Sequence, residues 1–179
     1  MSIEIVKHQV KLFVSSSTPE VMGIKGAWGV GKTYSWKKYL SEYKFDKAIA
    51  LPRYSYVSLF GINSLDAFKY AIFENTVKRD LIGTEASIET FKENTTGIAD
   101  SLTRKSYNIF RNAPLIKNFS STIESLSFLS ITETLICIDD LERKGKGLDI
   151  KDLLGLISLL KEQKKCKIVI LLNDGEDGL

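Results

Sequence analysis

The chain is poor in the residues that most often build metal sites and disulfide frameworks, with one histidine, His8, and two cysteines among 179 residues. A cluster of histidine ligands is therefore excluded. A Ser-His-Asp triad would have to use His8. The presence of this histidine is explained more simply by a position on the surface of a helix. Cys137 and Cys166 both lie within apolar runs. That setting favours reduced, buried thiols over disulfide bonds or metal ligation.

Long apolar runs are also missing, and none approaches the roughly 18 residues that a membrane-spanning helix needs. The N-terminus, MSIEIVKHQVKLFV, carries charges throughout and lacks the apolar core of a signal peptide. We therefore expect a cytoplasmic protein without a transmembrane segment. The net charge of +3 is small for this length. It gives no sign of a nucleic-acid surface, which would show as a concentrated basic stripe.

The chain alternates instead between short apolar strands and amphipathic helices. Ile3, Val6, Val10, Phe13 and Val14 recur at helical spacing, which predicts an N-terminal helix. Strands are predicted at VMGIKG, RYSYVSLFG, TLICIDD and KIVILLND. Apolar strands that alternate with helices indicate an α/β fold of three layers, in which helices flank a mainly parallel sheet on both faces.

The remaining helices follow from apolar spacing and capping residues. The helix from Thr33 onward carries an apolar face of Trp36, Tyr39, Leu40 and Tyr43. Further helices are expected after Asn63, as the capping residue, and after Asp149. Between positions 81 and 129 the pattern is weaker and indicates two helices, around Leu102 and Ile123.

The stretch GAWGVGKTYSW lies between the first predicted strand and the next helix, and it fits the pattern G-x-x-x-x-G-K-[ST]. Its glycines let successive backbone N–H groups point at phosphate oxygens, and the following helix adds the positive end of its dipole. Lys32 can reach the β- and γ-phosphates, and the Thr33 hydroxyl can bind Mg²⁺. A plain glycine turn is the alternative, but the position between strand and helix favours a nucleotide site. The residues expected to bind ATP are Gly26, Ala27, Trp28, Gly29, Val30, Gly31, Lys32, Thr33 and Tyr34.

Two carboxylates end the apolar strand LICIDD. In open α/β sheets ligands bind at the carboxyl ends of the strands, so Asp139 is expected to hold Mg²⁺, usually through water, as a Walker B aspartate does. Asp140 is then placed to orient or deprotonate the attacking water. The alternative is that one of the two merely caps the following turn.

Asn173 and Arg143 are weaker candidates at the same edge. Asn173 ends the last strand and could contact the γ-phosphate or water, although a simple Asn-Asp turn explains it equally well. Arg143 could contact phosphate, or the nucleotide of a neighbouring subunit as an arginine finger does. Lys144 and Lys146 are better explained as solvated loop charges. The predicted catalytic residues are thus Asp140, Lys32 and Arg143.

These motifs resemble those of the KAP P-loop NTPases, which show a W-G-x-G-K-T loop and a D-D-L-D-R segment after the Walker B strand. The match comprises Trp28, Gly29, Gly31, Lys32, Thr33, Asp139, Asp140, Leu141 and Arg143, with Glu142 in place of the family's usual aspartate. The resemblance implies a Mg²⁺-dependent ATPase of the additional-strand class that acts as a conformational switch. It also implies a downstream effector domain, a partner protein or a homo-oligomer, and for bacterial members a role in phage exclusion or defence signalling.

The resemblance further implies the sheet order 5-1-4-3-2, whereas the sequence shows four core strands and stops before the expected fifth. The strand at Val21 would then lie at the sheet edge, where proteins normally cover or pair a strand. This predicts a fragment of a longer protein, or an edge covered by the N-terminal helix or by a partner. Slow or absent ATPase activity of the isolated chain is the expected consequence.

We expect one P-loop NTPase domain over residues 1–179. It comprises an N-terminal helix (1–18), a phosphate-loop half (20–80), a helical insertion (81–129) and a Walker B half (130–179). Two other functions stay open from the sequence: a small-molecule kinase, and a nucleotide-dependent binding module with little hydrolysis. A kinase of this kind would need an arginine-rich lid, which is not evident here.

Overall fold

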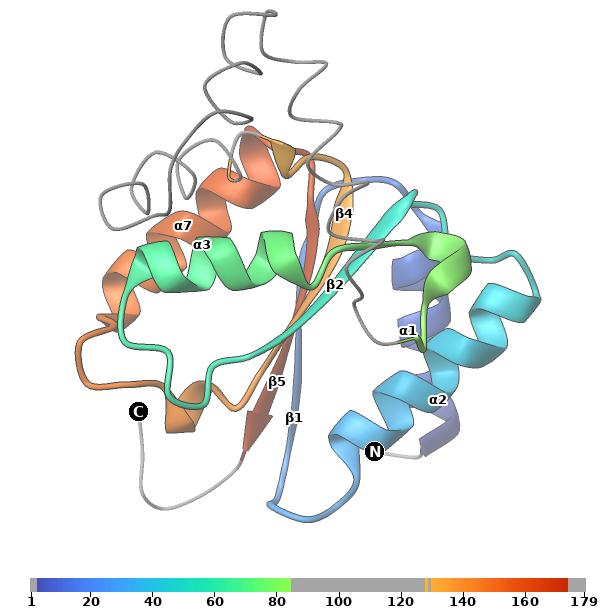
Figure 1. Ribbon diagram of the computed structural model, residues 1–179. Helices are drawn as coiled ribbons and strands as arrows, with labels where there is room; N and C mark the ends of the chain where they lie inside the picture. The colour runs from blue at the N-terminus through green and yellow to red at the C-terminus, as the bar shows by residue number, and fades with distance from the viewer. Residues whose placement is uncertain (1–2, 85–127, 129, 174–179) are drawn as a thin grey trace, which may run out of the picture.

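The computed structural model describes residues 3–84, 128 and 130–173. The helices predicted around Leu102 and Ile123 lie outside this part of the chain. Figure 1 shows the elements in colour from blue to red. In chain order they are α1 (Ile3–Ser15), β1 (Val21–Gly26), α2 (Lys32–Phe45), β2 (Arg53–Ser58), α3 (Leu65–Glu74), β3 (Val77–Lys78), the 3₁₀ turn η1 (Arg79–Leu81), β4 (Thr134–Asp139), the 3₁₀ turn η2 (Leu141–Arg143), α7 (Ile150–Glu162) and β5 (Lys167–Asn173).

The sheet has the strand order β1-β5-β4-β2-β3. The first four strands are parallel to one another, and the two-residue β3 pairs antiparallel with β2. The four predicted core strands and their order are confirmed. The short β3 was not predicted, because two residues are too few to show a strand period. Among the described residues β1 pairs with β5 only, so it lies at one edge of the sheet.

Helices cover both faces of this sheet. Figure 1 shows α1 and α2 on one side and α3 and α7 on the other. The predicted apolar face of α2, with Trp36, Tyr39, Leu40 and Tyr43, packs with α1 against β4 and β5. The opposite core joins α3 and α7 to the other side of the same strands, through residues such as Phe68, Leu153 and Ile168. The predicted three-layer α/β fold is confirmed.

Capping side chains place the starts of α3 and α7. The helix predicted at Asp149 is confirmed as α7, and the Asp149 side chain caps it by accepting from the backbone N–H groups of Lys151 and Asp152. The prediction that Asn63 caps α3 is wrong. Ser64 is the cap, since it has the extended backbone of a cap residue and its hydroxyl accepts from the Ala67 N–H. Asn63 lies one residue too early and donates to the Gly61 carbonyl instead.

The single histidine and the two cysteines lie in the surroundings that the sequence predicted. His8 is exposed on α1. Cys137 and Cys166 are free and buried. In the part of the chain that the structure describes, no helix has both the length and the apolar composition needed to cross a membrane.

Candidate functional site

The phosphate loop connects the end of β1 at Gly26 to the start of α2 at Lys32. Gly29 and Gly31 have φ angles of 77° and 82°, in the left-handed region that side chains disfavour. Gly31 is also the residue before α2 and has no capping side chain. The first N–H groups of α2 therefore lack a side-chain partner at this position and are available to an anion, as in other helix-based phosphate sites.

The Lys32 ammonium is turned onto its own loop. Its Nζ donates to the carbonyl oxygens of Gly26 at 2.8 Å and Ala27 at 2.9 Å. The two bonds hold the ammonium against the loop, where it can contact a phosphate bound to the loop. A phosphate at this position would replace neutral carbonyl acceptors with charged oxygens, which form stronger hydrogen bonds to an ammonium.

Asp139 lies at the end of β4 and is 5% exposed, yet its carboxylate has three hydrogen-bond donors. Its Oδ2 accepts from the Thr33 hydroxyl at 2.6 Å and from the Tyr56 hydroxyl at 2.8 Å. Its Oδ1 accepts from the Asp140 backbone N–H at 2.9 Å. The Thr33 contact joins the phosphate loop to the predicted Walker B strand, two segments separated by 106 positions in the chain.

Asp140 is held differently. Its backbone adopts the left-handed conformation, with φ 55°, and its Oδ2 accepts from the Ser58 hydroxyl at 2.6 Å. The Arg143 guanidinium lies 3.8 Å from its Oδ1. The alternative that it caps η2 is not supported, because its side chain makes no capping hydrogen bond there.

Arg143 lies over aromatic rings at this edge of the sheet. The centre of its guanidinium is 4.0 Å from the Phe60 ring centroid and 5.8 Å from that of Trp28. Cation–π contacts of this kind orient the guanidinium next to both the phosphate loop and Asp140. Trp28, Val30 and Tyr34 are all largely exposed on the loop and at the start of α2.

Two other predicted residues have partners near this edge. Asn173, at the end of β5, donates through its Nδ2 to the Glu142 carboxylate. Lys144 was expected to be a solvated charge, but this prediction is wrong: it is half-buried and its Nζ donates to the Leu148 carbonyl at 2.6 Å. Lys146 is exposed, as expected.

Sequence reasoning missed Tyr56, Ser58 and Phe60, which all come from β2 or directly after it. The pairing of β2 with β4 sets Ser58 beside Asp139. The polar residues of RYSYVS were a visible signal, but nothing in the sequence gave the register of this strand against its neighbour.

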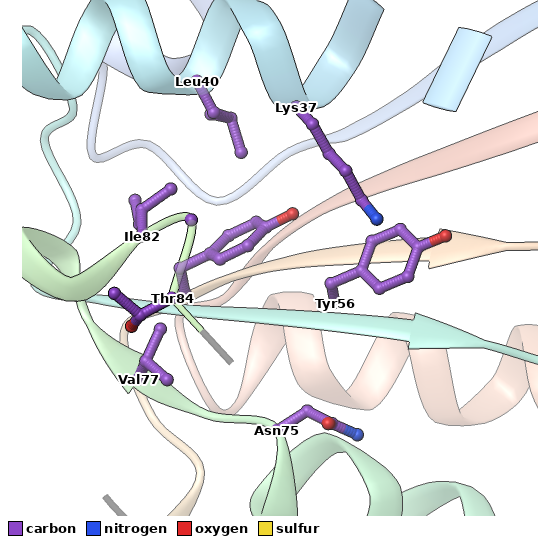
Figure 2. Close-up of a pocket in the computed structure, with 9 residues that line it drawn as sticks. Lys37, Leu40, Tyr56, Asn75, Val77, Ile82 and Thr84 are labelled. Atoms are coloured by element: carbon purple, nitrogen blue, oxygen red, sulfur yellow. The ribbon is translucent and has the colours of Figure 1, made fainter. Parts of the chain in front are cut away.

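A cavity of about 630 Å³ lies beside this site, between α2 and the β2–β3 region. Figure 2 shows Lys37 and Leu40 on one side of it and Val77, Ile82 and Thr84 on another. Tyr56 lines the cavity with its ring and reaches the carboxylate site with its hydroxyl.

Comparison with protein families identifies the family of this chain. A search of curated proteins finds no match to the chain. A solved structure of the ORC2 protein of Aeropyrum pernix, described as ADPNP–ADP complexes, aligns with 97% of this chain and 40% of its own, at 14% identity and a TM-score of 0.44. The family model described as the KAP family P-loop domain matches residues 3–176, nearly the whole sequence. The chain therefore belongs to the KAP family of P-loop NTPase domains.

Proposed function

We propose that this domain binds ATP with Mg²⁺, hydrolyses it, and acts as a conformational switch. The observation that carries the proposal is the 2.6 Å hydrogen bond from Thr33 to Asp139. It brings the Thr33 hydroxyl, in the first turn of α2, and the Asp139 carboxylate, at the end of β4, to one point. Nucleotide phosphates bound on that helix start would meet both groups.

The residues at this point suit magnesium. Mg²⁺ prefers oxygen ligands and is commonly held by one or two protein groups together with water and substrate phosphates. Thr33 and Asp139 supply a hydroxyl and a carboxylate of this kind. When bound, the ion would supply positive charge that offsets the negative charge of the phosphates. The loop N–H groups and Lys32 would bind the phosphates themselves.

Hydrolysis requires a group that handles the attacking water, and Asp140 is the proposed one. Its carboxylate is half-buried, lies next to the magnesium residues and is oriented by Ser58. Arg143 is proposed to contact phosphate in its own site or in a neighbouring subunit. Asn173 is proposed to contact the γ-phosphate or water through the amide atoms that its bond to Glu142 does not use. A role in phage exclusion is supported by the family resemblance alone.

Substitution of the loop lysine tests the nucleotide site. Lys32→Ala should lower the affinity for Mg·ATP by roughly 10- to 100-fold, because hydrogen bonds to charged groups contribute about 1.5–3 kcal/mol. Isothermal titration calorimetry measures the effect. Lys38→Ala, an exposed lysine on the same helix, is the matched control and should bind as the wild type does. Equal affinities for the Lys32→Ala and wild-type proteins would contradict the assignment of the loop.

A further inference from the structure

Tyr56 contacts the Asp139 carboxylate, and the proposed function gives this contact no role. Its hydroxyl donates to the Asp139 Oδ2 at 2.8 Å, on the same oxygen that accepts from Thr33. We propose that Tyr56 is a positioning residue for magnesium: it fixes the Asp139 carboxylate in the orientation that the ion needs. This inference rests on the proposed function and extends it to a residue on a neighbouring strand.

The strand pairing places the Tyr56 hydroxyl with precision. β2 and β4 are parallel neighbours, with Tyr56 beside Cys137 and Ser58 beside Asp139. A tyrosine two positions before the carboxylate in this register can extend along the strand direction to reach it. Figure 2 shows the Tyr56 ring with its hydroxyl toward the carboxyl end of β2 and the Lys37 side chain above the ring. The Lys37 Nζ lies 4.5 Å from the ring centroid, a cation–π contact that restrains the ring.

The phenol acts as the donor in this contact, because its hydroxyl carries the proton and the carboxylate oxygen accepts it. Unlike Thr33, Tyr56 is not proposed to bind the ion itself.

Loss of this donor should loosen the carboxylate. Without Tyr56, Oδ2 would be held by Thr33 alone, whose own oxygen is expected to contact the ion. Outer groups that orient metal ligands commonly change metal affinity by 10- to 100-fold when they are removed. Removal of the Tyr56 hydroxyl should therefore lower the ATP affinity measured with Mg²⁺. The ATP affinity measured without metal, which depends on the loop, should stay the same.

The experiment compares Tyr56→Phe with Tyr54→Phe, a matched pair that removes the same hydroxyl from two tyrosines of β2. The Tyr54 hydroxyl accepts from the buried Trp36 Nε1 at 3.0 Å and does not contact Asp139 in any described hydrogen bond. ATP affinity is measured by calorimetry for both variants and the wild type, once with Mg²⁺ and once with EDTA. Urea unfolding is measured in parallel.

We expect Tyr56→Phe to reduce the gain in ATP affinity that Mg²⁺ produces by about 10-fold, with the affinity in EDTA unchanged. Tyr54→Phe should keep the full magnesium gain and instead lower the urea midpoint. A wild-type magnesium gain in Tyr56→Phe would overturn the positioning role while leaving the proposed function intact, as would an equal loss of affinity with and without metal. If the ATP affinity of the wild type did not depend on Mg²⁺, both the positioning role and the proposed function would be contradicted.

Discussion

Asp139 and Asp140 are adjacent in the sequence, but the fold gives them different surroundings. Asp139 is buried and accepts from Thr33, Tyr56 and the Asp140 N–H. Asp140 is half-buried and accepts from Ser58. Several donors fix the orientation of the Asp139 carboxylate, which suits a group that helps to hold a cation, whereas the more exposed Asp140 carboxylate can receive a proton from water. This difference is the structural basis for giving the two residues separate roles.

Substitution of Asp140 tests the hydrolytic role at the residue scale. Asp140→Asn should bind Mg·ATP with nearly wild-type affinity but hydrolyse it on the order of 100-fold more slowly, since the amide cannot accept a proton. The left-handed backbone at this position, φ 55°, tolerates asparagine as well as aspartate. Phosphate release and calorimetry measure the two properties.

Asp152→Asn is the control for Asp140→Asn, because Asp152 is an exposed aspartate in the first turn of α7, outside the proposed site. It should retain most of the hydrolysis. Normal turnover by Asp140→Asn would remove Asp140 from the mechanism. Transfer of phosphate to a small molecule in place of water would favour the kinase alternative, and ATP binding without turnover in the wild type would favour the binding module.

At the scale of single elements, two glycines should respond to alanine with opposite signs. Gly31 precedes α2 with φ 82°, so Gly31→Ala should cost about 1–2 kcal/mol of stability through backbone strain. Gly155 lies exposed within α7, and a methyl group there would meet nothing within 4 Å. Gly155→Ala should therefore stabilise the domain by about 0.5–1 kcal/mol.

Urea unfolding of both glycine variants measures these changes in the free energy of unfolding. The Gly31 variant should also lose ATP affinity, because the strain falls on the loop, whereas the Gly155 variant should bind as the wild type does. If Gly31→Ala were neutral in both measurements, the loop conformation would not depend on glycine at that position.

At the scale of the whole molecule, one buried thiol lies in each of the two cores. Cys137 belongs to the core beneath α1 and α2, and Cys166 to the core beneath α3 and α7. Burial raises the pKa of Cys166 from its usual 9.0 to about 11 and raises that of Cys137 well above the same value. Both thiols are therefore neutral in the folded state at a pH where the unfolded chain has begun to ionise.

Stability should accordingly fall at alkaline pH. The contribution of each thiol is fully present below pH 9, the pKa in the unfolded chain, and is lost as the pH rises from there toward the folded-state pKa. We expect the free energy of unfolding to drop by about 2 kcal/mol between pH 8 and pH 10. Urea titrations at the two pH values measure it. Cys166→Ala should show roughly half the drop, and a wild type with equal stability at both values would contradict the prediction.

Some features of the molecule follow from short stretches of the sequence. The phosphate loop was predicted because positive-φ glycines, a lysine and a threonine are local requirements that only a few residues satisfy. The core strands and the apolar face of α2 were predicted because their apolar period is local as well. Their order in the sheet came from the family resemblance, and the pairing of β1 with β5 confirms it.

Other features were decided only by the tertiary structure. The donors that hold the two carboxylates, Tyr56 and Ser58, lie 83 and 82 positions from their partners, and only the register of β2 against β4 joins them. The capping role of Ser64 and the buried partner of Lys144 depended likewise on the exact path of the backbone. The sequence thus determined which chemical groups reach the carboxyl edge of the sheet, because that depends on local pattern. The neighbouring strand decided how those groups are held, because strand pairing is a long-range interaction whose register no short segment contains.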